Sequence, residues 1–258
     1  MEGRTALVTG GAGHVGKAIC DALAENGAAI AVLDCNEEAC TTTCTSLAGT
    51  YGVKALPVVM DLTDEKKLRK VPAQVMKQCG SLDVLVNCAA LVGTSALKGW
   101  GVPFAEQDAD TWRLALEVNL TVPFILSQAS APHLARSGHG SVINIGSIYG
   151  INGPDMHLYE GTAMGNPAAY AASKGGLVQL TRWLATVMAP AVRVNAITLG
   201  GLYRNQAEAF FFRYVKKTPL QRMATEDDVK GAALYLASDL SAYVTGQNLV
   251  VDGGFTVW

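Results

Sequence analysis

The chain has 258 residues, of which 50% are hydrophobic and only 16% are charged, and its formal net charge is -2. This length suits a single α/β domain, and we expect residues 1-258 to form one. A near-neutral balance without a cluster of Lys and Arg disfavours nucleic acid as a partner. The low charged share indicates a surface covered by further subunits, so we expect a homo-oligomer, either a tetramer or a dimer.

The first residues, Met1 to Arg4, lead straight into a strand pattern without the basic and apolar segments of a secretory signal. We therefore expect a cytoplasmic protein. The apolar runs have strand length, far below the ~20 residues that span a bilayer, so no membrane segment is expected. The six cysteines are scattered without the paired spacing of a zinc site, which predicts buried or half-buried thiols and no metal site.

Short β-branched runs alternate along the chain with stretches of helical period, as in βαβ units. The predicted strands are Thr5–Thr9, Ala28–Leu33, Lys54–Val59, Leu82–Val86, Gly140–Ser147, Val192–Ile197 and Asn248–Val251. Asp108 or Asp110 is expected to cap a long helix that reaches Leu134, and Thr225 with Asp228 predicts a capping box for a later helix. The pattern predicts a doubly wound α/β fold, with a mainly parallel seven-stranded sheet and helices on both faces.

Two segments resist regular assignment. Residues 90–107 are one, and residues 148–167, rich in Gly, Pro and Asn, are the other. Long irregular segments in a compact α/β fold are often binding loops, so 148–167 is the predicted substrate loop. Residues 199–217, which include three consecutive aromatics at Phe210 to Phe212, are predicted to form a mobile lid over the substrate.

A glycine-rich turn follows the first strand directly, in the run Thr9-Gly-Gly-Ala-Gly-His-Val-Gly16. Glycines let the backbone turn sharply and approach a pyrophosphate, whose charge the N-terminus of the next helix favours. The position between the first strand and the first helix predicts a dinucleotide site. Its expected cofactor-binding residues are Gly10, Gly13, His14, Val15 and Gly16.

A carboxylate, Asp34, ends the second strand about twenty residues after the glycines, where it would accept hydrogen bonds from an adenosine ribose. The same carboxylate would repel a 2′-phosphate, and its neighbours Cys35 and Asn36 supply no cation. NAD is therefore favoured over NADP, while a solvated Asp at a strand end is the alternative. Asp61 and Leu62, after the third strand, are expected at the adenine edge.

Tyr170 and Lys174 lie four residues apart in a helical pattern, which puts the phenol and the ammonium on one face. A positive charge stabilises phenolate, so the pKa of Tyr170 should fall from about 10 toward neutral pH. Such a pair provides a proton donor and acceptor without a metal. Because this spacing also arises by chance, the interpretation depends on the other motifs.

Those motifs occur together and in the order of the short-chain dehydrogenase/reductase family, which the chain resembles over essentially its whole length. The matching segments are Thr9-Gly10 with Gly16, Asn87-Cys-Ala-Ala90, Asn119 in Val-Asn-Leu, Ser147, Tyr170 with Lys174, Val192 to Ile197, and Gly246 to Gly254. The resemblance implies a Rossmann-fold oxidoreductase. It adds Asn87, Ala89, Tyr170, Lys174, Gly200 and Leu202 to the expected cofactor-binding residues.

The resemblance also implies a catalytic role for each of four residues. Tyr170 transfers the proton, and Lys174 lowers its pKa and binds the nicotinamide ribose. Ser147 orients the reacting oxygen, and Asn119 holds a water in a proton relay. Taken alone, Ser147 and Asn119 would be interpreted as a strand-end hydroxyl and a structural amide.

The chain departs from the family pattern at several positions. His14 stands where a glycine is usual, so its side chain must be accommodated near the pyrophosphate or bond to it. Leu199 replaces the usual proline before Gly200, which predicts a differently shaped loop beside the nicotinamide. Cys88 and Ala90 replace an Asn and a Gly, and should alter packing more than chemistry.

The substrate loop carries the run Leu158-Tyr-Glu-Gly-Thr162, which resembles members associated with bacterial sugar and nonulosonic-acid biosynthesis. The expected substrate is a sugar or sugar phosphate, and the expected substrate-binding residues are Ser147, Tyr149, Tyr159, Glu160 and Arg204. The alternatives are an NADPH-dependent reductase of 3-oxoacyl thioesters, a dinucleotide-binding protein without catalysis, and a sugar-nucleotide epimerase or dehydratase.

Overall fold

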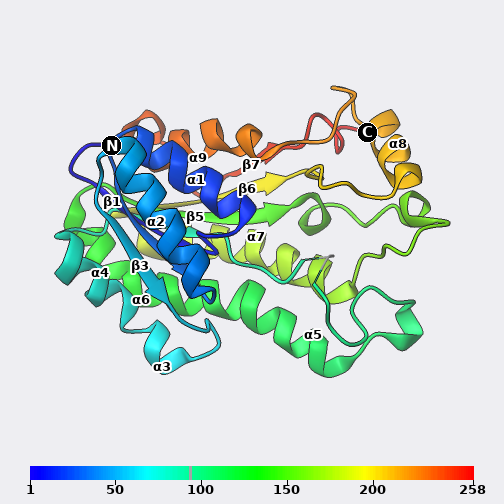
Figure 1. The fold of residues 1–258 in the computed structure, drawn as a ribbon, viewed down its shortest axis with the longest axis horizontal. Helices are drawn as coiled ribbons and strands as arrows, with labels where there is room; N and C mark the ends of the chain where they lie inside the picture. The colour runs from blue at the N-terminus through cyan, green and yellow to red at the C-terminus, as the bar shows by residue number, and fades with distance from the viewer. Residues whose placement is uncertain (93–94) are drawn as a thin grey trace.

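The computed structural model describes residues 1–92 and 95–258, and its strands form one sheet in the order β3-β2-β1-β4-β5-β6-β7 (Figure 1). Each of these strand pairings is parallel, which confirms the predicted fold class. The strands are β1 (Thr5–Thr9), β2 (Ala29–Asp34), β3 (Ala55–Val59), β4 (Val84–Asn87), β5 (Gly140–Ser147), β6 (Val192–Leu199) and β7 (Asn248–Val251).

Helices cover both faces of the sheet (Figure 1). One face carries α1 (His14–Glu25), α2 (Glu37–Tyr51) and α9 (Lys230–Ala237), and the other carries α4 (Val71–Cys79), α6 (Val122–Ser137) and α7 (Ala168–Met188). The shorter α3 (Glu65–Leu68) and α5 (Ala109–Leu116) lie on the second face, and α8 (Glu208–Lys217) lies beyond the carboxyl ends of the strands.

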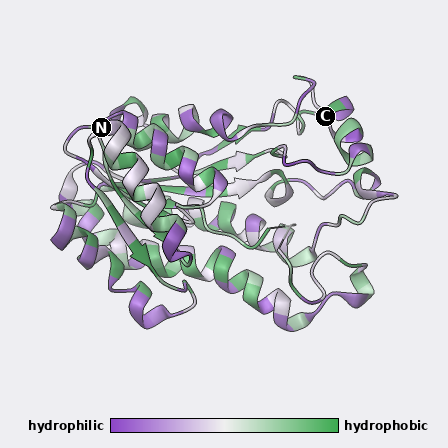
Figure 2. Ribbon diagram, in the orientation of Figure 1, coloured by the Kyte–Doolittle hydropathy of each residue, from purple (hydrophilic) through white to green (hydrophobic). Residues whose placement is uncertain are grey.

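Two hydrophobic clusters lie on opposite faces of the sheet, and they explain why the strand patterns are nearly continuous in apolar residues. Every residue of β1 and of β5 is buried. Strands covered on both faces need apolar side chains on both, unlike the alternating pattern of a half-exposed strand. Hydrophobic residues accordingly concentrate in the strands and on the inner faces of the helices (Figure 2).

The long helix expected from Asp108 onward is two helices joined by a π-helical turn, Glu117–Thr121. Asp108 is the residue that caps it, because its carboxylate accepts hydrogen bonds from the backbone of Asp110 and Thr111, each at 3.0 Å. By length and apolar composition alone the run Ala109–Ser137 could cross a membrane. In this fold α5 packs on α7, and α6 packs on β4 and β5, which accounts for its apolar character.

Short helical turns complete the chain: Phe104–Glu106, Ile148–Gly150, Met156–Tyr159, Glu226–Val229 and Asp239–Ser241. The predicted capping box at Thr225 and Asp228 is confirmed, although the first turn after it is a 3-10 helix that leads into α9. Residues 93 and 94 of the segment expected to be irregular lie outside the described residues.

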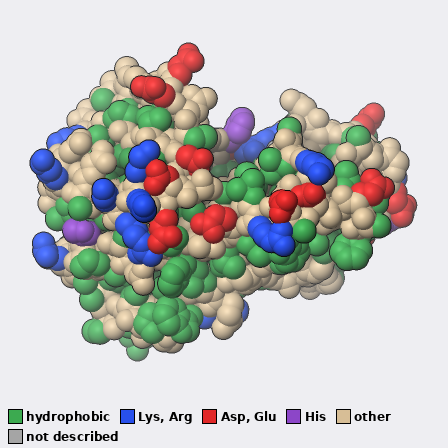
Figure 3. Space-filling view, turned by 90° about the horizontal axis from the view of Figure 1, so that it is seen from below, with side chains coloured by type: hydrophobic (Ala, Val, Ile, Leu, Met, Phe, Trp, Pro, Cys, Tyr) green, Lys and Arg blue, Asp and Glu red, His purple; other side chains and the backbone are tan. Residues whose placement is uncertain are grey.

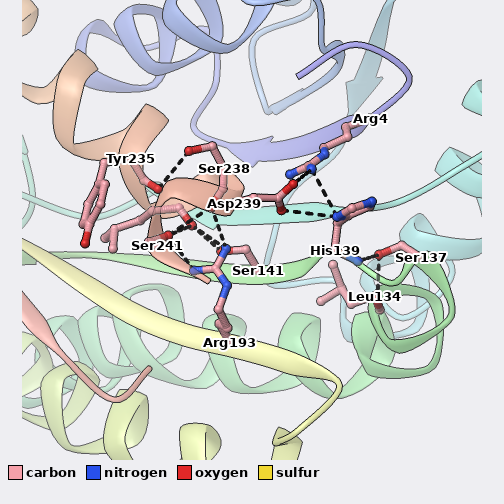
Figure 4. A network of polar contacts seen from close by, with 11 residues as sticks. Arg4, Leu134, Ser137, His139, Ser141, Arg193, Tyr235, Ser238, Asp239 and Ser241 are labelled. Atoms are coloured by element: carbon pink, nitrogen blue, oxygen red, sulfur yellow. Dashed lines mark hydrogen bonds and ion pairs between the residues drawn. The ribbon is translucent and has the colours of Figure 1, made fainter. Parts of the chain in front are cut away.

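The amino ends of the strands are closed by a polar network (Figure 4). Arg193 of β6 donates to Ser241 Oγ at 2.8 Å and to the Leu236 carbonyl at 3.0 Å. Arg4, at the start of β1, pairs with Asp239, whose other carboxylate oxygen lies 3.3 Å from His139 Nδ1. These contacts tie the chain before β1 to the turns before β5 and β7.

The surface mixes apolar and charged groups. On the face seen from below, hydrophobic side chains lie between acidic and basic ones (Figure 3). Trp183 and Val187 of α7 are 54% and 53% exposed.

The prediction that the cysteines are buried or half-buried was wrong at Cys35. This residue is exposed because it follows the end of β2 instead of lying within the strand.

Candidate active site

The glycine-rich turn packs so closely that side chains are excluded from it. A Cβ atom on Gly16 would lie 2.0 Å from the Gly10 carbonyl oxygen, and one on Gly10, where φ is +62°, would lie 2.9 Å from Ala89 Cα. Gly13 precedes α1 without a side-chain cap, so the amide groups of the first helical turn are open to an anion. This geometry fits the pyrophosphate of a dinucleotide.

The predicted adenosine-side residues lie at the carboxyl ends of β2 and β3. Asp34 ends β2, and one of its oxygens accepts from the backbone of Asn36 at 3.3 Å. Asp61 accepts from the backbone and the hydroxyl of Thr63 at 2.9 and 2.8 Å, so its carboxylate is used to form a turn. Leu62 packs against the hydrophobic cluster beneath the sheet.

Ser147, Tyr170 and Lys174 meet at one cavity of about 640 Å³. Ser147 ends β5, and the other two come from successive turns of α7, as their spacing predicted. The Lys174 side chain is buried, with Nζ 2.7 Å from the Ile145 carbonyl oxygen and 5.9 Å from the centre of the Tyr170 ring. Val15 and Cys88 line the same cavity, which connects it to the glycine-rich turn.

The prediction that the pKa of Tyr170 falls toward neutral pH was wrong, because the pKa is raised. Burial raises the pKa of Tyr170, and the largest opposing effect is a hydrogen bond with Ser147 rather than the charge of Lys174. Burial also lowers the pKa of Lys174 to about 8. Both groups are shifted toward their neutral forms because burial disfavours the charged form more strongly than the neighbouring groups favour it.

Asn119, in the π-helical turn, has its amide engaged by the protein. Its Oδ1 accepts from the Leu91 backbone at 2.8 Å, and its Nδ2 donates to the Leu91 carbonyl and to Ser173 Oγ, both at 3.1 Å. Both amide N–H groups are therefore used, and only one lone pair of Oδ1 is free for a water. The side chain fixes the segment after β4 against α7.

Asn87 also faces the interior. Its Nδ2 donates to Asn144 Oδ1 at 2.8 Å, and Asn144 donates to Thr181 Oγ1 at 2.9 Å, so a polar chain links β4, β5 and α7. The backbone of Ala89 instead lies at the turn, where it donates to Thr9 Oγ1 at 3.1 Å.

Gly200 and Leu202, which follow β6, line the cavity, and their role in cofactor binding stays a prediction. The Gly200 amide donates to the Val251 carbonyl at 2.9 Å, which extends the pairing of β6 with β7. His14 does not line the cavity; its side chain is 72% exposed and faces Glu226.

One part of the cavity is built from aromatic residues of the two segments predicted as loop and lid. The hydroxyl groups of Tyr149 and Tyr159 are 2.6 Å apart, and both residues line the cavity with Arg204. Tyr159 packs against Phe210 of α8, with ring centres 5.2 Å apart.

The prediction that Glu160 binds substrate in this cavity was wrong, because the structure does not bring its side chain to the cavity. Its side chain is 64% exposed and pairs with His157 at 2.8 Å on the surface. The residue before it turns inward, so adjacent side chains in this turn point to opposite sides. The segment 148–167 is instead tied to α8, since Lys217 pairs with Asp155 at 2.8 Å and Arg213 donates to the Glu160 carbonyl.

Sequence reasoning missed several residues of the cavity. Asn166 is the most informative, because its Oδ1 is buried and, among the described residues, has no hydrogen-bond partner. A polar residue before Pro167 at the start of α7 was the available signal. The other missed lining residues include Met164, Gln206, Tyr214 and Met223.

Comparisons with known proteins agree with this geometry. Residues 10–256 match a family model described as enoyl-(acyl carrier protein) reductase. The chain is 33% identical over 262 residues to a probable galactose dehydrogenase of Rhizobium meliloti, covering 98% of this chain and 95% of that one. It is 30% identical to post-translational flagellin modification protein A of Campylobacter coli over 99% of both chains.

Solved structures are similar too. A gluconate 5-dehydrogenase from Burkholderia cenocepacia, in complex with NADP and tartrate, superposes with a TM-score of 0.88 at 31% identity, over 100% of this chain and 97% of that one. An NAD⁺-bound xylitol dehydrogenase superposes with a TM-score of 0.86 at 28% identity, over 98% and 99%. The chain therefore belongs to the short-chain dehydrogenase/reductase family. It is an oxidoreductase enzyme.

Proposed function

We propose that this enzyme moves a hydride between NAD and a secondary alcohol or its ketone, and that the substrate is a sugar or sugar phosphate. The observation that carries the proposal is the meeting of Tyr170, Ser147 and Lys174 at a cavity that reaches the glycine-rich turn. Bound NAD would supply the hydride acceptor.

In the proposed mechanism, Tyr170 exchanges a proton with the reacting oxygen, and the Ser147 hydroxyl holds that oxygen by a hydrogen bond. On oxidation Tyr170 in its phenolate form would take the proton of the carbinol hydroxyl, while the carbinol carbon would release its hydride to bound NAD. Lys174 would bind the nicotinamide ribose through its buried ammonium. Asn119 would accept one hydrogen bond from a relay water, because its donors are used elsewhere.

The choice of NAD over NADP rests on Asp34. Its carboxylate stands at the end of β2, where a ribose diol would donate to it and a 2′-phosphate would be repelled. The solved relatives include both an NAD-bound and an NADP-bound enzyme, so the cofactor is a property to be tested in this chain.

The sugar-like substrate is supported by the polar groups of the cavity. The Tyr149 and Tyr159 hydroxyls, and the Asn166 Oδ1 that has no partner within residues 1–92 and 95–258, give an apolar cavity a few hydrogen-bonding groups suited to hydroxyl recognition. In the proposal, residues 148–167 form the substrate loop and 199–217 the lid. Two relatives, 32% and 31% identical, are named galactitol 2-dehydrogenase and D-threitol dehydrogenase, after polyol substrates.

A second candidate is the reduction of 3-oxoacyl thioesters with NADPH. It is favoured by a 31% identical 3-oxoacyl-[acyl-carrier-protein] reductase of Thermotoga maritima, covering 100% of this chain and 99% of that one. The carboxylate of Asp34 disfavours NADPH, the cofactor that this reaction would need.

The test is a spectrophotometric assay of both cofactors against polyols, sugars, sugar phosphates and a 3-oxoacyl thioester. We expect NAD reduction with a hydroxylated substrate and at least ~10-fold lower kcat/KM with NADP, and Asp34→Ala should narrow that ratio. Turnover of the thioester with NADPH alone would replace the first proposal by the second. NAD binding without turnover of any substrate class would support a non-catalytic dinucleotide-binding protein.

We also propose that the enzyme works as a homo-oligomer. The exposed apolar residues of α7, together with Trp112 and Leu114 of α5, support it. Light scattering after gel filtration would give the mass, and a monomer at micromolar concentration would contradict this proposal.

A further inference from the structure

Glu226, in the 3-10 turn before α9, stands between two cations from distant parts of the chain. One of its oxygens lies 3.2 Å from Arg204 Nη2 and 3.3 Å from Arg204 Nε. The same oxygen lies 3.8 Å from His14 Nδ1, which is charged only when protonated. His14 begins α1, directly after the glycine-rich turn, so Glu226 links this turn to the predicted lid.

Arg204 is held where its charge reaches the reacting centre. Gln206 accepts from the Arg204 backbone at 2.7 Å and donates to the Leu202 carbonyl, and Asn205 adopts a left-handed conformation with φ of 54°. Arg204 lines the cavity. Burial raises the pKa of both Tyr170 and Cys88, and the charge of Arg204 is one of the smaller effects that oppose this rise. Lys174, the other basic residue that lines the cavity, is buried and donates to the Ile145 carbonyl, whereas Arg204 is partly exposed.

The contacts of Glu226 have the character of a replaceable counterion. Only one carboxylate oxygen is used, at distances longer than those of a close bidentate pair, and the side chains of Arg204 and Glu226 are 32% and 33% exposed. Partly exposed pairs of this kind contribute little to stability, because water screens them. By contrast, Arg222 and Asp228 in the same region form a bidentate pair at 2.6 and 2.7 Å.

The position of Glu226 is also one that an anion favours. The 3-10 turn packs on α1, and the carboxylate faces the first residue of that helix, whose N-terminus is partially positive and has no side-chain cap. A dinucleotide bound at the glycine-rich turn would bring its pyrophosphate to the same helix end. Two anions would then compete for the same cations.

We propose that Glu226 is a displaceable counterion, which holds Arg204 and His14 at the glycine-rich turn until the pyrophosphate of the dinucleotide takes its place. This inference rests on the proposed function only in requiring that the chain bind a dinucleotide. Arg204 thereby becomes a positioning residue that draws the start of the lid onto the bound cofactor. Dinucleotide binding and ordering of the substrate cavity are coupled through this exchange.

The test is calorimetric titration of the full chain with NAD, ADP-ribose and adenosine, without substrate. Glu226→Gln removes the competing charge, so we expect NAD and ADP-ribose to bind about 3–10-fold more tightly, while adenosine, which lacks a pyrophosphate, is unaffected. Arg204→Met should weaken NAD and ADP-ribose about 10-fold. In the Arg204→Met background, Glu226→Gln should lose most of its effect, because its main partner is gone.

The matched control is Asp227→Asn. Asp227 is the next residue on the same 3-10 turn and carries the same charge, but it pairs with Lys230 at 2.6 Å on the surface. The control should bind all three ligands as the wild type does. Thermal melts of each variant show whether it is folded.

Several results would overturn the inference. Equal shifts in Glu226→Gln and Asp227→Asn would indicate a general charge effect, and a shift with adenosine would place the effect away from the pyrophosphate. Unchanged or weaker NAD binding by a folded Glu226→Gln variant would refute displacement. These outcomes leave the proposed function intact if the wild type still oxidises a polyol, whereas failure of the wild type to bind any dinucleotide would remove both.

Discussion

The two ends of the sheet differ in how well their half-buried and buried charged groups are hydrogen-bonded. At the amino ends, Arg193 donates to a hydroxyl and two backbone carbonyls, and Arg4 pairs with Asp239 (Figure 4). At the carboxyl ends, Lys174 has one carbonyl partner, and Tyr170 has a hydroxyl of Ser147 beside an open cavity.

This difference indicates that the amino ends of the strands contribute stability, whereas the carboxyl ends carry groups that cost stability and are available for catalysis. A charged group with several good hydrogen bonds holds elements together, whereas a buried ammonium with one neutral partner costs stability and shifts its pKa. Parallel strands bring their carboxyl ends to one edge, so the ligands and their poorly paired side chains collect there. Substitutions at the two ends should separate stability from activity.

The largest expected effect is on turnover at the carboxyl end. Tyr170→Phe removes the proton donor and acceptor, so kcat should fall by about 10³ or more, while the Kd of NAD stays within about twofold. Steady-state kinetics and calorimetry measure the two quantities. Tyr235→Phe, on the surface of α9, is the matched control and should behave as the wild type. Near-normal turnover of Tyr170→Phe would refute its role.

Lys174→Met should change how stability depends on pH. Because burial lowers the folded pKa of Lys174 to about 8, the folded chain binds fewer protons than the unfolded chain between about pH 8 and 10.5, and the wild type gains stability as pH rises through this window. The gain is up to about 3 kcal/mol, from 1.36 kcal/mol per pKa unit.

The variant lacks this gain, so its stability relative to the wild type should be highest near pH 7 and fall toward pH 10.5. Urea unfolding of the protein without cofactor at four pH values measures the difference. A parallel pH dependence in the two proteins would mean that the Lys174 pKa is not lowered. Its kcat should also fall, since the ammonium is the cation beside Tyr170.

Arg193→Met tests the amino end, and there we expect stability to suffer without loss of activity. Its loss leaves the Ser238 and Leu236 carbonyls with fewer donors, at a cost of about 2 kcal/mol in the free energy of unfolding. Well below the melting temperature kcat/KM should stay within about twofold. Arg182→Met, an exposed arginine of α7, is the control for charge removal. A loss of activity in the folded Arg193→Met variant would break the distinction between the two ends.

The smallest effect is expected at Asn166. Because its Oδ1 has no protein partner in the described part of the chain, Asn166→Ala should change stability by less than about 1 kcal/mol. The KM for a polyol should rise about 10-fold if a substrate hydroxyl donates to this oxygen. An unchanged KM alongside altered stability would make the side chain structural.

The sequence was sufficient to predict those features of the fold and the site that depend on the local pattern of residues. All seven predicted strands are present, within two residues at each end, because burial on both faces leaves a continuous apolar signal. The glycine-rich turn and the Tyr170–Lys174 spacing were equally readable. The side-chain direction of Glu160, the engagement of Asn119 and the raised pKa of Tyr170 depend on neighbours far along the chain, and local pattern does not contain them.

The bonds that join Lys217 and Arg213 of α8 to residues 155–160 bear on how this enzyme could acquire a new specificity. Residues 148–167 and 208–217 border the cavity together and are joined by these bonds. Exchange of either stretch alone with that of a relative would leave these partly exposed donors without the carboxylate and carbonyls that they now bond. A graft intended to alter what the enzyme accepts should therefore carry 148–167 and 208–217 together.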